Sequence, residues 1–307
     1  LTTNNVWMMV CTFLVFFMHL GFTFLEIGLT RQKNSINILF KNFFVINAGL
    51  IIYCAIGFNL MYPSEWIIEG ILGVPDPWLD AEAAADLGYN EGYTYWTDFL
   101  FQGMFAATAA TIISGAVAER IKISSFMLIA ILYVAIVYPI VGAWKWGGGF
   151  MDAAGFYDFA GSTLVHAVGG WGALVVIYFL GARKGRFGKG GGAIPGSNVP
   201  LSAAGVMILW LGWFGFNGGS VLSADPALTS VTLVNTCLAA AAGGLSCAGL
   251  YKVFYGKADI MMFMNGVLGG LVGITAGADL MLPGSSILIG IISGPVVFLS
   301  SSLLERA

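Results

Sequence analysis

One histidine stands in the middle of an apolar, glycine-rich stretch, DFAGSTLVHAVGGWGAL. The stretch covers residues 158–174, and His166 is its only ionisable residue after Asp158. An ionisable side chain is expensive inside an apolar segment, and those that are present usually carry function. An imidazole donates and accepts hydrogen bonds and exchanges a proton near neutral pH. His166 is therefore a candidate for hydrogen bonding or proton relay within an apolar segment.

Each ionisable residue of the apolar runs also has a structural interpretation. His166 can be a core histidine bonded to a serine or threonine of a neighbouring helix, although helical spacing would put Ser162 beside it on a small, polar-tolerant face. Asp158 can cap a helix and interact with its dipole. The second histidine, His19 in FFMHLGF, is interpreted as a core residue without a role, and Glu26 in FLEIG as a structural residue tied to a nearby helix end.

Several other kinds of site have no counterpart in the sequence. The four cysteines lie inside apolar runs, without CxxC spacing or clustered histidines, so neither a disulfide framework nor a metal site is predicted. There is no HExxH, no nucleophile elbow and no pair of carboxylates within the apolar runs, which argues against an enzyme and against a cofactor. No basic face is present, so nucleic acid is not an expected partner.

The elements that must position these residues are membrane spans. Of the 307 residues, 58% are hydrophobic and 9% are charged, whereas a soluble domain carries about a quarter charged residues. A helix that crosses a bilayer needs about 20 apolar residues, and these runs do not alternate as the strands of a barrel would. The runs that qualify as spans are 6–29, 36–61, 96–118, 123–143, 159–181, 201–222, 228–251, 261–280 and 286–304.

The basic residues lie on alternate loops. Only Lys145, of the 13 lysines and arginines, lies on the other side, and loop 62–95 carries acidic residues and no base. Because cytoplasmic loops are enriched in lysine and arginine, we expect a multi-pass protein of the plasma membrane with its N-terminus outside. The residues that indicate the cytoplasmic side are Arg31, Lys33, Lys41, Arg120, Lys122, Arg183, Lys184, Arg186, Lys189, Lys252, Lys257 and Arg306.

Five motifs occur in order at the ends of these spans. They are FLEIGLTRQKN (24–34), FQGMFAATAATIISGAVAER (101–120), WGGGF (146–150), DFAGSTLVH (158–166) and GWFGFNGGS (212–220). Together they make the chain resemble the ammonium transporter family (Amt/Mep/Rh) over essentially its whole length. The resemblance implies an all-α membrane protein, a polytopic bundle of eleven spans built from two inverted five-helix repeats and a last helix. Residues 1–307 would form a single transporter domain.

The resemblance implies roles for four residues at the outer mouth. Phe105 and Trp146 match the aromatic residues that cup an ammonium ion, and Ser220 matches the hydroxyl that accepts a hydrogen bond from it. Phe105 and Phe216 match a stacked pair that closes the pore below. An aromatic face attracts a desolvated cation by about 2 kcal/mol, which cannot offset the full loss of hydration. Neutral ammonia would pass once a proton is removed. Without its motif, Trp146 would be an interfacial belt residue.

Two further residues match elements around the pore. Asp158 matches a buried acid that supports the outer site without touching the ion, and His166 matches the first of two facing pore histidines. The family carries the second histidine in a tenth span, and no histidine follows His166 here. We therefore expect nine of eleven spans, with a first repeat at about 1–185, an incomplete second at about 199–307, and a chain truncated after the ninth span.

Partners and alternative functions follow from the same resemblance. It implies ammonium or ammonia as the substrate, a lipid bilayer as the environment, a homotrimer with one pore in each subunit, and a cytoplasmic regulatory protein that meets a C-terminal tail. Two alternatives stay open at this point: an ammonium sensor domain of a larger signalling protein, and an uncoupled gas pore. Trp146 and Ser220 argue against the gas pore, since a neutral solute needs no site for a cation.

Overall fold

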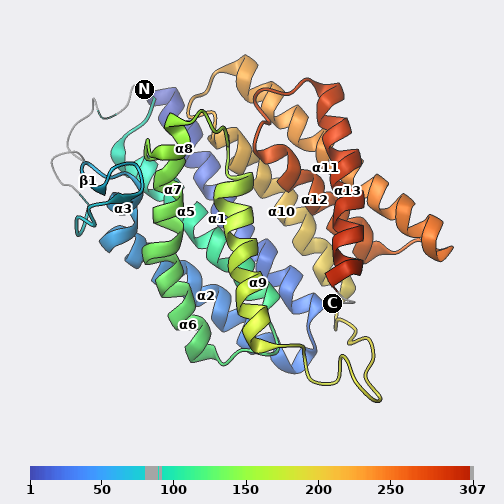
Figure 1. The fold of residues 1–307 in the computed structure, drawn as a ribbon. Helices are drawn as coiled ribbons and strands as arrows, with labels where there is room; N and C mark the ends of the chain where they lie inside the picture. The colour runs from blue at the N-terminus through green and yellow to red at the C-terminus, as the bar shows by residue number, and fades with distance from the viewer. Residues whose placement is uncertain (80–88, 90–91, 305–307) are drawn as a thin grey trace.

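The computed structural model describes residues 1–79, 89 and 92–304, and these residues form a bundle of long helices (Figure 1). The strands found in these residues are β1 (Trp66–Ile68) and β2 (Leu72–Gly73), which pair antiparallel in the loop before α5. The α-helices are α1 (Thr2–Leu29), α2 (Ser35–Ile52), α3 (Phe58–Met61), α5 (Tyr95–Ala116), α6 (Ile123–Leu132), α7 (Tyr138–Lys145), α8 (Phe150–Ala153), α9 (Val168–Leu180), α10 (Val199–Gly219), α11 (Pro226–Tyr255), α12 (Ile260–Thr275) and α13 (Pro283–Leu304).

Four short segments have other helical geometries. η1 (Gln32–Asn34) is a 3₁₀ turn before α2, and three π-helical segments continue neighbouring α-helices: η2 (Tyr53–Gly57), η3 (Tyr133–Val137) and η4 (Ser162–Ala167). A π segment adds one residue to the turn and rotates every side chain that follows, and such segments gather at functional sites. Hydropathy did not predict them, because it reports the length of an apolar run and not its hydrogen-bond register.

The predicted all-α membrane architecture is confirmed, with one span shorter than expected. In the described part of the chain, eight helical stretches are long and apolar enough to cross a membrane. The predicted span 261–280 instead ends at Thr275, so α12 has 16 residues. Its last predicted turn leaves the helix because Asn235 of α11 donates to the carbonyls of Ala278 and Met281, at 2.9 and 2.6 Å.

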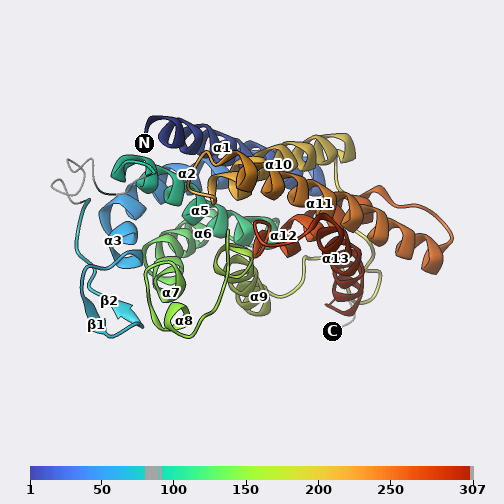
Figure 2. The ribbon, with the colours of Figure 1, turned by 90° about the horizontal axis from the view of Figure 1, so that it is seen from above.

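Glycines let the longest helices pack closely. α1 and α10 lie side by side, as the view from above shows (Figure 2). A Cβ on Gly205 would come within 2.5 Å of the backbone nitrogen of Leu25. Between α11 and α12, a Cβ on Gly270 would meet the carbonyl of Ala239. Small residues at such contacts give the close packing that holds helices together in lipid, where no hydrophobic force drives them together.

The two ends of the bundle differ in the residues that they gather. At one end, the carboxylate of Glu119 accepts bonds from Arg31 and from Arg183, each at 2.9 Å, and thereby joins loops 30–34, 117–122 and 181–198. We call this the basic end. At the opposite end, Asn5 accepts bonds from the start of α5, and Asn4 accepts one from the segment after α10. We call this the cavity end.

The charge pattern of the sequence needs one correction. Lys41 does not flank a loop: it is buried in α2 with 3% of its surface exposed, 3.9 Å from the carboxylate of Glu26. Lys145, the base predicted on the other side, pairs with Asp152. Five charged residues of the pattern lie outside the described residues: Asp80, Glu82, Asp86, Glu91 and Arg306.

Candidate functional site

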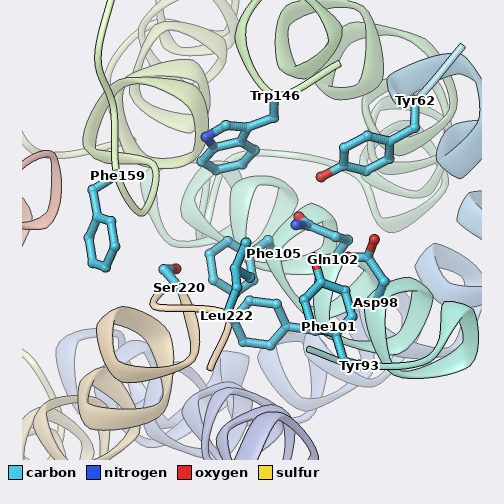
Figure 3. A pocket seen from close by; sticks show the side chains of 10 residues that line it. All are labelled: Tyr62, Tyr93, Asp98, Phe101, Gln102, Phe105, Trp146, Phe159, Ser220 and Leu222. Carbon is cyan, nitrogen blue, oxygen red and sulfur yellow. The ribbon is translucent and has the colours of Figure 1, made fainter. Parts of the chain in front are cut away.

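The cavity end holds a pocket of about 210 Å³ that brings together predicted and unpredicted residues (Figure 3). Phe105, Trp146 and Ser220 all line it, although they come from α5, the end of α7 and the end of α10. Its walls are mostly aromatic, with a few polar groups. The described lining residues are Tyr62, Tyr93, Asp98, Phe101, Gln102, Phe105, Trp146, Phe159, Ser220 and Leu222.

Trp146 is held over this pocket by its motif and by Asp158. Within WGGGF, Gly148 takes a left-handed φ of 78°, which turns the chain directly after the tryptophan. The indole Nε1 donates to the carbonyl of Asp158 at 3.0 Å. Gly161, at φ 97°, lacks the side chain that would come 3.0 Å from the indole ring. The tryptophan is therefore fixed by two turns rather than free at a lipid interface.

Ser220 follows directly after α10, and its hydroxyl forms one hydrogen bond with the backbone of that helix. The hydroxyl donates to the carbonyl of Phe216 at 2.9 Å and so keeps its lone pairs for another donor. Because Ser220 lines the pocket, it presents an acceptor there. An ammonium ion has four N–H donors, so this arrangement suits the role that the resemblance implies.

Phe105 of the pocket wall stacks on a second phenylalanine, Phe216, which is not among the described lining residues. Phe105 and Phe216 are buried and stacked, with ring centroids 4.0 Å apart and planes at 18°. Phe101 packs on Phe105 at 4.6 Å, and Trp146 meets Phe105 edge-on at 6.3 Å. Phe105 thus belongs both to the pocket wall and to the stack.

His166 lies on the far side of this stack. Its ring is 5.2 Å from that of Phe216 and stacks on Trp213 at 4.9 Å, and Trp213 is fixed by a bond to Thr275. The histidine is buried, and its Nε2 has no hydrogen-bond partner among the described residues. The alternative interpretation, in which His166 is a core histidine bonded to a hydroxyl, therefore has no support at Nε2. The expected neighbour Ser162 bonds instead to Val272 of α12.

Asp158 does not line the pocket. Its side chain accepts hydrogen bonds from backbone N–H groups instead. Its carboxylate accepts four backbone N–H bonds of 2.8–3.0 Å, from Gly161, Ser162, Thr163 and Leu164. These are the free N–H groups at the start of η4, so the structural interpretation as a cap is present in the geometry. The same residue holds Trp146 through its carbonyl and begins the segment that carries His166.

Comparison with known proteins agrees with this arrangement. The family model described as the Ammonium Transporter Family matches residues 6–307. The chain belongs to the ammonium transporter family. Ammonium transporter Amt2 of Archaeoglobus fulgidus is 42% identical to it over 318 residues, covering 100% of this chain and 66% of that protein. As a family member, the chain is a membrane transport protein rather than an enzyme.

Solved structures of the family have the same fold. A structure named Sensor Amt Protein matches with a TM-score of 0.91 and 34% identity, over 99% of this chain and 75% of that one. Mep2 of Candida albicans matches with a TM-score of 0.88 and 28% identity, over 99% and 68%. The chain spans 55–69% of the length of three curated relatives that it matches.

His19 and Glu26, to which no transport role was assigned, both lie buried on α1. His19 is buried, with Nδ1 3.5 Å from the hydroxyl of Thr111 and no partner for Nε2 among the described residues, so only one of its nitrogens meets a polar group. Nearer the basic end, Glu26 accepts a bond from Ser114 at 2.9 Å, and Lys41 donates to the Ser114 carbonyl at 2.8 Å. Glu26 is thus tied to neighbouring helices, as the structural interpretation expected.

Sequence reasoning missed two polar residues of this family member's pocket. Asp98 and Gln102 lie on the face of α5 that also carries Phe101 and Phe105. In DFLFQGMF, Gln102 follows Asp98 by four residues, and Phe101 and Phe105 follow them by three residues each; this helical spacing is the signal that would have found them. A charged residue at the start of an apolar helix is ordinarily assigned to the cap or the dipole. Glu119, which joins three loops, was also missed, although it lies in the motif FQGMFAATAATIISGAVAER.

Proposed function

We propose that this protein carries ammonium or ammonia across the plasma membrane through an apolar path that begins in the pocket. Ammonium is captured between Phe105, Trp146 and Ser220, loses a proton, and continues as ammonia past the stacked rings. One observation carries the proposal: Phe105 lines the pocket and stacks on Phe216, and Phe216 contacts His166. This is an unbroken line from an aromatic cation site to a buried imidazole.

The chemistry of the site supports selection by proton loss. The aromatic faces and the Ser220 acceptor stabilise a cation that can donate hydrogen bonds. They do not supply enough energy to strip the ion for a dry path, because full desolvation of a charge costs far more. Beyond the stack, the unpartnered Nε2 of His166 offers hydrogen bonding and a route for the proton without a permanent charge. We expect a second histidine, in a tenth span, to face it.

We also propose the orientation and the repeat arrangement implied by the resemblance. The basic end faces the cytoplasm, which puts the pocket and the N-terminus outside. α1 runs from the cavity end to the basic end, and α10 runs back, with Asn198 beside Gly28 and Ser220 at the pocket. This antiparallel packing of the first spans of segments 1–185 and 199–307 supports inverted repeats.

The proposed assembly is a homotrimer with one pore in each subunit, and the proposed partner is a cytoplasmic regulatory protein that meets a C-terminal tail. Both rest on the family resemblance. Cross-linking in native membranes, followed by mass measurement, tests the trimer, and a dimer or monomer as the largest species would contradict it.

The substitution Trp146→Leu tests the capture site. Loss of an attraction of about 2 kcal/mol corresponds to a KM for methylammonium raised about 30-fold, and discrimination against neutral solutes should relax. The measurement is uptake of labelled methylammonium into proteoliposomes.

Trp144→Leu is the matched control, because Trp144 bonds to Ile71 and is not a lining residue of the pocket. An unchanged KM in Trp146→Leu, or an equal change in Trp144→Leu, would remove Trp146 from the capture site.

A further inference from the structure

The pocket has a second, acidic end that the capture of a single ion between Trp146 and Ser220 does not use. In Figure 3, Asp98, Gln102 and Tyr62 lie together on one side, and Ser220 and Phe159 lie on the other. The carboxylate-bearing Asp98 is 5% exposed and Gln102 is 9% exposed. The described residues that line the pocket include no lysine or arginine, so the charge of Asp98 is not neutralised within the lining.

The hydrogen bonds at this end leave acceptors open. The carboxylate of Asp98 accepts a bond at Oδ2 from the hydroxyl of Tyr89, at 2.7 Å, and it also accepts one from the side chain of Gln102, which leaves further lone pairs free. The amide oxygen of Gln102 is buried and has no partner among the described residues. Buried polar atoms are nearly always paired, so an unpaired acceptor in a residue that lines a cavity points to a donor bound nearby.

The chemistry of the acceptors defines the class of ligand. A carboxylate, an amide oxygen and phenolic oxygens form a set rich in acceptors with negative charge, which favours a small cation that donates hydrogen bonds. The volume of about 210 Å³ exceeds what one ion needs, since a water molecule occupies about 30 Å³ in the liquid. An ion can therefore rest at the acidic end with part of its hydration and remain apart from the aromatic end.

We propose that Asp98 and Gln102 form an entry subsite that binds the ammonium ion, still partly hydrated, before it reaches Trp146 and Ser220. The subsite rests on the proposed function and adds a first binding step to it. A negative charge in a low-dielectric cleft concentrates cations at its mouth and raises their capture rate. Asp98 thereby sets the concentration at which the transporter works, whereas Trp146 and Phe105 select the ion.

The competing explanation is that Asp98 only anchors the loop before α5 through Tyr89. The two explanations separate on substitution. Asp98→Asn removes the charge and keeps the size, whereas Tyr89→Phe removes the anchor and keeps the charge. Moving the charge by four residues, in Asp98→Asn with Gln102→Glu, restores a cation site on the same helix face but does not restore an anchor for Tyr89.

The experiment measures methylammonium uptake into proteoliposomes and its equilibrium binding by titration calorimetry. Asp98→Asn should raise KM and Kd about tenfold, at the lower end of electrostatic focusing, with maximal uptake changed less than about twofold. The double variant should recover most of the loss. Glu69→Gln, which removes an exposed charge from the same loop region, and Tyr89→Phe should match the parent.

Three results would overturn the subsite: a parental Kd in Asp98→Asn, the same loss in Tyr89→Phe, or no recovery in a folded double variant. Failure of the proposed function gives a different pattern. If the parent binds methylammonium but does not transport it, the transport proposal fails, and the binding constants of the variants still decide the subsite. If the parent does not bind methylammonium at all, both proposals fail.

Discussion

The cavity end and the basic end of this transporter both bury polar groups, but only the groups at the cavity end line the pocket. At the cavity end, Ser220 and Gln102 line the pocket, and the buried amide oxygen of Gln102 has no partner among the described residues. At the basic end, Glu119 meets Arg31, Asn34 and Arg183 in a closed network. Polar groups that line a cavity can meet a ligand, whereas the network around Glu119 joins loops. The same residue types therefore serve transport at one end and stability at the other.

The largest loss of stability is expected at the buried pair of the basic end. Lys41→Met would leave the Glu26 carboxylate buried beside Ser114 without its cation, which costs about 3–5 kcal/mol. Thermal unfolding in detergent measures the loss as a lower Tm. Adding Glu26→Gln should recover much of it, because no buried charge then remains unpaired. If Lys41→Met melts like the variant of an exposed lysine, Lys33→Met, the pair does not stabilise the bundle.

A smaller loss of stability is expected at Glu119, and it depends on pH. Burial alone would raise the pKa of Glu119, but hydrogen bonds from Arg31, Arg183 and Asn34 outweigh it and lower the pKa from 4.5 to about 2. Because the pKa is lower in the folded protein, the carboxylate stabilises it above pH 4.5. That stability is lost as pH falls toward 2.

Glu119→Gln should therefore lower the stability at pH 7 by about 2 kcal/mol, the value of a charged hydrogen bond. The difference in Tm between parent and variant should shrink below pH 4.5, and uptake KM should not change. A difference that stays constant down to pH 3 would show that the carboxylate charge is not what holds the three loops.

The smallest effect is expected at Ser220, on the cavity side of the comparison. Ser220→Ala removes one acceptor worth about 1 kcal/mol, so the methylammonium KM should rise about fivefold with an unchanged Tm. Ser230→Ala is the matched control, since its hydroxyl makes the same bond to the carbonyl four residues earlier but lies on an exposed surface. A lowered Tm with an unchanged KM would show that Ser220 stabilises the fold and does not bind the substrate.

The sequence predicted the positions of most spans well, because apolar length is a local property. The run 96–118, for example, corresponds to α5 at Tyr95–Ala116. It predicted α12 poorly, because residues 276–280 leave the helix through a contact with Asn235, which lies on another helix. Lys41 was assigned to a loop for the same reason, since its partner Glu26 lies across the interface with α1. Contacts between distant segments are not visible in the composition of either one.

The site was predictable where motifs carried it and not elsewhere. Motif matching selected Phe105, Trp146 and Ser220, and the fold brings them to one pocket. Motif matching did not select Asp98 and Gln102, because their role depends on the pocket that they line. Motif matching also did not predict the π segment η4. In this segment the backbone N–H of His166 donates to the carbonyl of Gly161, five residues earlier, and this bond sets the direction in which the His166 side chain leaves the helix.

The central claim is that the path runs from the pocket through the Phe105–Phe216 stack to His166, and the two histidines test it most directly. Both are buried, and each leaves Nε2 without a partner among the described residues, but only His166 contacts the stack. Currents evoked by ammonium in proteoliposomes on a solid-supported membrane should vanish in His166→Ala and persist in His19→Ala, with both proteins folded. Parental currents in His166→Ala together with an inactive His19→Ala would contradict this path.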